Sequence, residues 1–245
     1  MRPQVDSIVA PRFPQMTWIN VAPLRMEKQA TRPVLIEFWD FCRPSSLRTL
    51  PYLQAWHERY GAAGLRVISV HAPGFETSRD EDQVRSAVER LDIRHPVAID
   101  AQFELWHAYE NQGWPSRYLF APRMKLAQAW FGEGGYRETE EIIQELLGAP
   151  GDPVPLVRPS DDDDAPIVIP TAEHAGPHDG PYAAGEAWIV TDRAGTVAIN
   201  GEDRELAHPG AHLLIAHERH TADELTVEPR GDVEVLLTWF APGLA

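Results

Sequence analysis

The chain has 245 residues, which exceeds the usual size of a single domain and favours two domains. Acidic side chains outnumber basic ones by 37 to 22, and the formal net charge of −15 repels phosphate backbones. The sequence contains no basic stripe and no run of about 20 apolar residues. Composition therefore excludes nucleic acid as an expected partner and provides no membrane-spanning segment.

The N-terminal residues do not have the pattern of a secretory signal peptide. Met1 to Asp6 contain one basic side chain, and Pro11 and Pro14 interrupt the segment that follows. A signal peptide needs a continuous apolar stretch after its basic start. We therefore expect a soluble, cytoplasmic protein.

Strand-like and helix-like segments alternate up to Gly148. Continuous β-branched or aromatic runs predict strands that are covered on both faces, and apolar residues at helical spacing predict helices. In chain order we expect a strand over 33–39, a helix over 45–60, a strand over 65–71, a helix over 80–91, a strand over 96–100, a short helix over 103–109, a hairpin of 117–121 with 126–131, and a helix over 139–147. This βαβαβαββα order predicts an α/β domain over residues 1–148.

The composition changes after that domain. Residues 149–166 are rich in proline and contain the acidic run Asp161–Asp164, so we predict a solvated linker. Residues 167–245 contain short strand-like segments separated by turn signals such as Asn200-Gly201. These segments, at 187–191, 196–200, 211–216, 224–227 and 233–240, predict a small all-β domain of the sandwich type.

Cys42 is the only cysteine of the sequence. One thiol cannot close an intrachain disulfide, and neither a CxxC motif nor the usual Cys/His zinc patterns can be assembled from it. The chain therefore cannot perform a dithiol redox cycle within one molecule.

Several short motifs in the first 148 residues match a known pattern. Phe38-Trp39 ends the first strand, Arg48-Thr49-Leu50-Pro51 lies in the first helix, Trp114-Pro115 precedes a strand, and Gly132-Glu133-Gly134 leads to the last helix. Together they resemble the thioredoxin-like domain of DipZ and related redoxins of the TlpA/AhpC type. The resemblance implies a thioredoxin-like fold, and the β tail is similar in position to the small β module that follows this domain in DipZ.

In that family a Cys-x-x-Cys motif opens the first helix. Aligned without gaps, its two cysteine positions fall on Arg43 and Ser46, so both thiols are absent. A second alignment, with compensating gaps, puts Cys42 in the first position and gives Cys42-Arg43-Pro44-Ser45. We favour the gap-free alignment. Because a helix N-terminus stabilises thiolate, Cys42 is in either case the candidate catalytic residue.

The resemblance also implies roles for residues outside this loop. Trp114-Pro115 corresponds to the pair whose cis peptide faces the active-site loop and pairs with an extended substrate backbone, and we group Trp39 with it as peptide-binding. Glu37 corresponds to a buried acid that helps proton transfer to the cysteines in many thioredoxins. The other interpretation of Glu37 is a side chain paired with a nearby Lys or Arg.

Two functions remain open. A divergent redoxin would use Cys42 alone, exchanging with an external thiol reductant or reducing peroxide, and it requires an exposed thiol. A non-catalytic module would bind an extended peptide or partner protein through residues 42–46 and Trp114-Pro115. A third hypothesis is a glycan- or ligand-binding role for the β tail.

We expect no cofactor and assign no metal site. The tail holds several histidines that could gather on a strand pair, but they lack the His-x-His or His-x-Asp/Glu pattern of metal-binding β folds. The histidines considered are His208, His212, His217 and His220.

Overall fold

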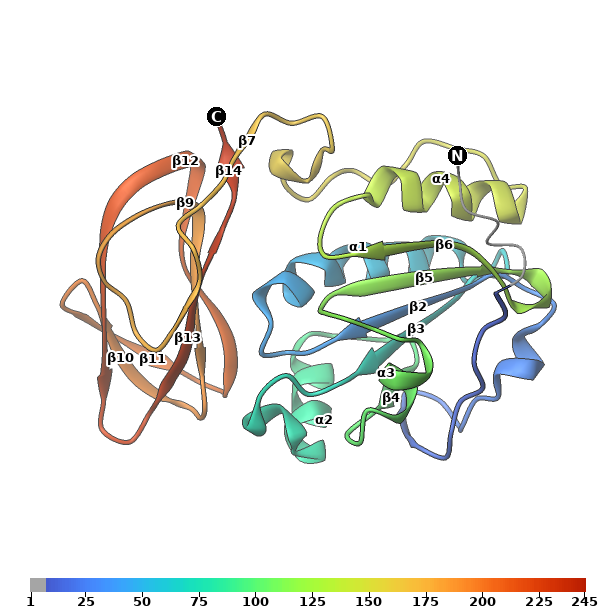
Figure 1. The fold of residues 1–245 in the computed structure, drawn as a ribbon, viewed down its shortest axis with the longest axis horizontal. Coiled ribbons are helices and arrows are strands. Elements are labelled where there is room, and N and C mark those ends of the chain that lie inside the picture. The colour runs from blue at the N-terminus through green and yellow to red at the C-terminus, as the bar shows by residue number, and fades with distance from the viewer. Residues whose placement is uncertain (1–7) are drawn as a thin grey trace. The chain divides into compact units, whose positions relative to one another are not determined.

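The structure, a computed structural model, describes residues 8–245 and divides into two compact units (Figure 1). Unit 1 runs to Asp40 and continues from Ser45 to Pro155, and unit 2 combines Phe41–Pro44 with Leu156–Ala245. The segment Met1–Asp6, on which the expectation about a signal peptide rests, lies outside the described residues. None of the helices within the described part of the chain is long and apolar enough to cross a membrane.

Unit 1 is built on a six-stranded sheet in the order β1-β4-β3-β2-β5-β6. The central strand β2 is parallel to β3 on one side and antiparallel to β5 on the other. All of its residues, Glu37 included, are buried, as expected for a β-prone run that is covered on both faces. The strands are β1 (Thr17–Ile19), β2 (Val34–Trp39), β3 (Arg66–His71), β4 (Val97–Ile99), β5 (Ser116–Ala121) and β6 (Lys125–Phe131).

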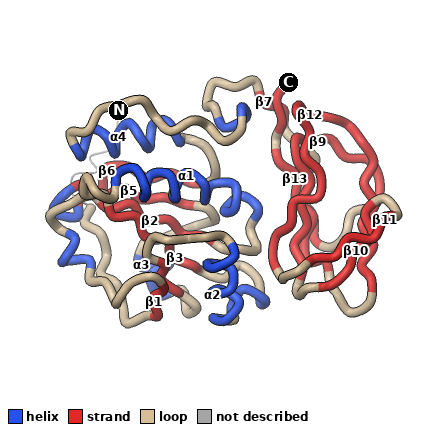
Figure 2. The backbone as a smooth tube through the Cα atoms, turned by 180° about the vertical axis from the view of Figure 1, so that it is seen from behind, coloured by secondary structure: helices blue, strands red, loops and turns tan. Residues whose placement is uncertain are grey.

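The α-helices described in the chain connect these strands or follow them (Figure 2). They are α1 (Pro44–Tyr60), α2 (Glu81–Arg90), α3 (Glu104–Ala108) and α4 (Tyr136–Leu147), with short 3-10 turns at Met26–Gln29, Glu76–Arg79 and Pro122–Met124. Every strand and helix predicted for this half of the chain is found, with shifts of a few residues at the ends. β1 is missed because three residues are too few to show a periodicity.

The two faces of β2 carry different side chains, because successive strand residues point to opposite sides. On one face Phe38 packs edge-on against Trp106 of α3, with ring centroids 5.8 Å apart. On the other face Glu37 lies in register with Arg117 of β5, and the guanidinium of Arg117 lies 4.8 Å from the ring centre of Tyr136. α4 therefore covers the face that holds the buried charges.

Unit 2 is built from β strands, with one 3-10 turn at Pro159–Asp161. Its main sheet has the order β11-β10-β12-β9-β13-β8, and β14 pairs with β7 separately. The fold class predicted for the tail is thus confirmed. The strands are β7 (Ile167–Val168), β8 (His174–Ala175), β9 (Asp179–Thr191), β10 (Gly195–Ile199), β11 (Glu202–Leu206), β12 (Gly210–Arg230), β13 (Val235–Ala241) and β14 (Gly243–Leu244).

The strands predicted over 211–216 and 224–227 are parts of one long strand, β12. Its register with β9 shifts between Leu213 and Ile215 and again between Ala216 and Thr221. Such bulges break the alternation of buried and exposed residues, so the sequence shows two segments where the chain forms one strand. β11 is missed because it consists mostly of charged residues, a composition that suits its place at the sheet edge.

The short segment Phe41–Pro44 joins unit 2 through Phe41. Ala211 N donates a hydrogen bond to Phe41 O at 3.2 Å. The Phe41 ring lies so close to Gly210 that a Cβ there would come within 2.7 Å of it, and Gly210 has φ +106°. Only glycine suits both conditions.

The acidic run after the first domain is not wholly solvated. Asp161 is buried, and its carboxylate forms an ion pair with Arg158, with Nη2 3.0 Å from Oδ2. The same carboxylate accepts from Arg158 N at 3.2 Å. The expected solvated linker is therefore corrected at this position, because a basic residue three positions earlier neutralises the first aspartate of the run.

α1 and α4 are joined through one buried carboxylate. Glu140, 1% exposed, accepts hydrogen bonds from Trp56 Nε1 at 3.1 Å and from Tyr60 OH at 2.6 Å. It also accepts from Val154 N at 2.9 Å. Burial and the hydrogen bond to Glu140 raise the pKa of Tyr60, so this phenol remains a donor. The carboxylate satisfies three donors from two separate segments, α1 and the stretch that follows α4.

We predict that Glu140→Ala lowers the free energy of unfolding of unit 1 by about 3 kcal/mol or more, because it leaves several buried donors without an acceptor. The adjacent Glu141 is exposed, so Glu141→Ala is the matched control and should change stability by at most about 0.5 kcal/mol. Urea unfolding, followed by the helical circular dichroism signal that comes from α1–α4, measures both. Equal stabilities of the two variants would contradict this account of the helix contact.

Candidate functional site

The start of α1 determines where the lost motif lies. α1 begins at Pro44, so Arg43 is the residue immediately before the helix and Cys42 is one position further out. The first thiol of a Cys-x-x-Cys motif sits at the helix N-terminus, where the backbone N–H groups and the dipole stabilise its thiolate. Arg43 and Ser46, the positions that the gap-free alignment gives to the two cysteines, lie at the residue before the helix and at its third residue.

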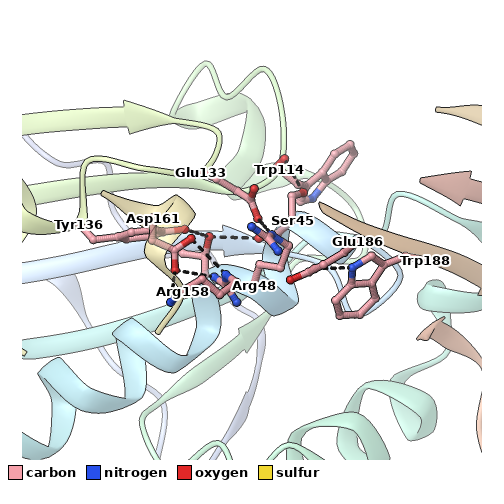
Figure 3. A network of polar contacts seen from close by, with 10 residues as sticks. Ser45, Arg48, Trp114, Glu133, Tyr136, Arg158, Asp161, Glu186 and Trp188 are labelled. Carbon is pink, nitrogen blue, oxygen red and sulfur yellow. Dashed lines mark hydrogen bonds and ion pairs between the residues drawn. The ribbon is translucent and has the colours of Figure 1, made fainter. Parts of the chain in front are cut away.

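The side chains at this helix end are engaged within the protein. Cys42 is completely buried. Ser46 is buried, and its hydroxyl accepts from Asp40 N at 3.3 Å. Ser45 is half-buried, and its Oγ donates to Trp114 O at 3.3 Å (Figure 3). Arg43 is half-buried as well. The site thus presents hydroxyl groups and a guanidinium, and no exposed thiol.

Asp40 links the end of β2 to the segment after β3. Its carboxylate is buried and accepts from Gly74 N at 2.7 Å and from Ser78 Oγ at 3.1 Å. His71 Nε2 lies 3.5 Å from the other carboxylate oxygen. The carboxylate is therefore occupied in holding the loop that follows β3.

The Trp114-Pro115 element lies against the first turn of α1. The peptide bond between the two residues is cis, as the family resemblance implies. The indole Nε1 of Trp114 donates to Ala72 O at 2.9 Å, and its ring lies 4.4 Å from that of Trp106. Trp114 is half-buried and Pro115 is buried. With the Ser45 hydrogen bond, both ends of Trp114 are fixed.

Trp39 lies inside the protein. It is 1% exposed, and its ring packs edge-on against His71 with centroids 5.3 Å apart. The sequence places Trp39 at the end of a strand but does not show which way its ring points. Its burial removes Trp39 from the surface that we consider for peptide binding.

Glu37 is a fully buried acid at the centre of the sheet. Ser69 on β3 and Arg117 on β5 lie in register on either side of it. Burial raises the pKa of Glu37 to about 8, although the positive charge of Arg117 and a 3.3 Å hydrogen bond from Ser69 Oγ both oppose the shift. Both interpretations of Glu37 thus describe part of its surroundings: it is a buried acid, and an arginine lies beside it.

Two known proteins are similar in sequence to part of this chain. DipZ of Mycobacterium tuberculosis is 31% identical over 146 residues, which cover 58% of this chain and 21% of DipZ. The thiol-disulfide oxidoreductase YkuV of Bacillus subtilis is 25% identical over 139 residues, which cover 55% of this chain and 93% of YkuV. The chain is thus similar to part of DipZ, and unit 1, which has a thioredoxin-like fold, is called the thioredoxin-like domain below.

A solved structure supports the fold of this thioredoxin-like domain. The crystal structure of the thioredoxin-like superfamily protein SPOA0173 matches with a TM-score of 0.54 at 20% identity, covering 60% of this chain and 100% of that protein. No protein-family model matches the chain. Because the chain spans about a fifth of the length of DipZ, the activity of that whole protein is not carried over.

The polar network of the thioredoxin-like domain extends beyond Glu37 to residues that sequence reasoning missed. Ser69 Oγ lies 2.7 Å from His95 Nε2, and His95 is fully buried. Burial and the neighbouring His57 lower the pKa of His95 to about 3, so the ring is neutral at pH 7. His57 and His95 both line a pocket of about 590 Å³. A serine within an apolar strand pattern gave no signal of this connection.

The tail histidines considered for a metal site form other contacts. The rings of His208 and His212 stack with centroids 4.3 Å apart, and His217 Nε2 lies 2.7 Å from Tyr182 OH. Among residues 8–245, no group of three or more His, Cys, Asp or Glu side chains has the geometry to hold a metal ion. The structure instead brings together His174 and His178, which the sequence did not pair.

We predict that Glu37→Gln removes a pH dependence of stability. The folded pKa of about 8 exceeds the ordinary value of 4.5, so the stabilising contribution of the protonated acid is full below pH 4.5 and is lost as pH rises through 8. A neutral glutamine avoids this loss, so the variant should be more stable than the natural protein at pH 9, on the order of 3–5 kcal/mol, and similar to it at low pH.

Urea unfolding across this pH range, again followed by helical circular dichroism, measures the effect. The exposed Glu141→Gln variant is the control and should keep the pH dependence of the natural chain. If Glu37→Gln and the natural protein lost stability in parallel between pH 5 and pH 9, the carboxyl would not be the neutral buried group described above.

Proposed function

We propose that the thioredoxin-like domain is a non-catalytic docking module that holds an extended peptide or partner segment beside Ser45 and Trp114. The observation that carries this proposal is the state of the motif loop. The only thiol of the chain is completely buried, and the second cysteine position is a serine whose hydroxyl is bound to Asp40 N. Thiol exchange needs an accessible thiolate, so the loop is better suited to binding than to redox chemistry.

The segment before the cis peptide offers a place where a peptide backbone can lie. Gln112 is exposed and Trp114 is half-buried. Gly113 stands between them, and nothing lies within 4 Å of the position that a Cβ would occupy. A glycine with open space beside it permits close approach of another backbone. Trp114, fixed by Ala72 and Ser45, then supplies a rigid aromatic contact of the kind that dominates binding energy.

The competing hypothesis is single-thiol exchange or peroxide reduction at Cys42, and it requires an accessible thiol in this loop. It needs the sulfur to be reached by a reagent and attacked or oxidised at a useful rate. Two measurements therefore distinguish the hypotheses: the reactivity of the Cys42 thiol, and the effect of removing that thiol on binding.

We predict that Cys42 in the folded full-length chain reacts with iodoacetamide much more slowly than in the unfolded chain, because burial excludes the reagent. Alkylation followed by mass spectrometry between pH 6 and pH 9, with and without denaturant, measures this ratio. Rapid alkylation of the folded chain well below the ordinary thiol pKa of about 8.5 would favour the redox hypothesis instead.

We also predict that short peptides selected from a random displayed library against the full-length protein bind at Gly113 and Trp114. Gly113→Val and Trp114→Ala should each weaken binding by roughly tenfold, about 1.4 kcal/mol. Cys42→Ser and the control Phe131→Ala, which removes a 65% exposed ring on β6, should leave affinity unchanged. Binding that depends on Cys42, or that ignores Gly113→Val, would contradict docking at this element.

A further inference from the structure

Two imidazole rings of unit 2 face each other at an edge of its main sheet. His174 Nε2 and His178 Nδ1 are 2.9 Å apart, and the ring planes are tilted by 34°. His174 lies on β8, the last strand in the sheet order, and is half-buried. His178 is 9% exposed. The pair is thus sheltered on one side and lies at a sheet edge on the other.

Backbone carbonyls fix which nitrogen of each ring carries hydrogen. His174 Nδ1 lies 3.1 Å from Ala175 O, and His178 Nε2 lies 3.2 Å from Gly180 O. A carbonyl can only accept, so each of these outer nitrogens is an N–H donor. In a neutral ring the inner nitrogen then has a lone pair. Two lone pairs 2.9 Å apart repel each other unless a proton or a metal ion lies between them.

We propose that His174 and His178 bind a divalent transition-metal ion of the Cu(II) or Ni(II) type. Histidines that bind metals characteristically donate their other ring N–H to a carbonyl or carboxylate, and both rings do so here. The ion accepts both lone pairs, so two metal–nitrogen bonds form. Any proton that the two inner nitrogens share leaves to solvent as the metal–nitrogen bonds form.

The spacing of the two nitrogens selects the geometry of the ion. With metal–nitrogen bonds of about 2.0–2.1 Å, two nitrogens 2.9 Å apart subtend roughly a right angle at the metal. A right angle separates neighbouring positions of a square-planar or octahedral ion, whereas tetrahedral zinc needs nitrogens about 3.3–3.4 Å apart. Cu(II) and Ni(II) prefer the first arrangement.

The surrounding residues hold this geometry in place. Thr238 Oγ1 donates to Gly176 O at 2.8 Å, and Val227 N donates to His178 O at 2.8 Å. The ring of Phe240 packs edge-on against His178 with centroids 5.2 Å apart. Since no third protein ligand completes the set within residues 8–245, the other coordination positions belong to solvent, and we expect a labile ion.

The test is a titration of the full-length protein, freed of metal by a chelator, with Cu(II), Ni(II) and Zn(II) in separate experiments. Isothermal titration should show one equivalent of Cu(II) bound, more tightly than Ni(II) or Zn(II). His174→Gln and His178→Asn place an amide where each inner nitrogen stood. Each should weaken Cu(II) binding by roughly tenfold or more. The His208→Gln/His212→Gln variant is the matched control and should bind as the natural chain does.

Electron paramagnetic resonance of the natural protein with one Cu(II) tests the site without any variant. It should show coupling to two imidazole nitrogens in a tetragonal environment. A spectrum with one imidazole, an affinity that His174→Gln and His178→Asn leave unchanged, or preferential binding of Zn(II) would each overturn the proposal. Circular dichroism of each variant confirms that a lost affinity is not a lost fold.

Discussion

A buried guanidinium beside a buried carboxyl determines much of the thioredoxin-like domain. Arg117 is fully buried, and its charge needs partners because an unpaired ion in the interior is very costly. The partners come from the end of the domain: Arg117 Nη2 donates to Gly134 O, and the guanidinium lies over the rings of Trp130 and Tyr136. The turn before α4 and the first residue of α4 are therefore held where they can serve this one cation. Glu37 occupies the neighbouring register position and is left largely neutral at pH 7, since burial outweighs the attraction of Arg117.

The neutral state of Glu37 matters for the chemistry of the candidate site. In a dithiol redoxin a buried acid matters because it exchanges a proton with the cysteines. In this chain the gap-free alignment puts Arg43 and Ser46 at the positions of those cysteines. The hydroxyl groups of the loop form hydrogen bonds within the protein: Ser46 accepts from Asp40 N, and Ser45 donates to Trp114 O. The two hydroxyl groups thereby fix the end of α1 against neighbouring loops. The absence of a second cysteine and the hydrogen bonds of the loop both support the docking role proposed above.

The sequence predicted the fold well wherever one kind of periodicity ran without interruption. β2 is a β-prone run, apolar except for Glu37, and lies at the centre of the sheet, within one residue of its predicted start. β12 was divided in two because its bulges interrupt the alternation on which the prediction depends. The site was harder to predict. The motif positions followed from the resemblance, but the burial of Cys42 and Trp39 depends on tertiary packing that no local pattern encodes. The hydrogen bond between Ser69 and His95 joins residues 26 positions apart, and neither residue type stands out in its segment.

Buried polar atoms need partners, and two buried carboxylates of the thioredoxin-like domain find theirs within the protein. Asp40 has Gly74 N and Ser78 Oγ, and Glu140 has three donors from two segments. In unit 2 the contact between His174 and His178 needs a proton or a metal ion between the two inner nitrogens, because carbonyls already occupy both outer nitrogens. A contact that is complete only with an added proton or metal ion responds to its surroundings. In this chain the hydroxyl groups at the start of α1 form hydrogen bonds within the protein, and the proposed metal site lies in unit 2.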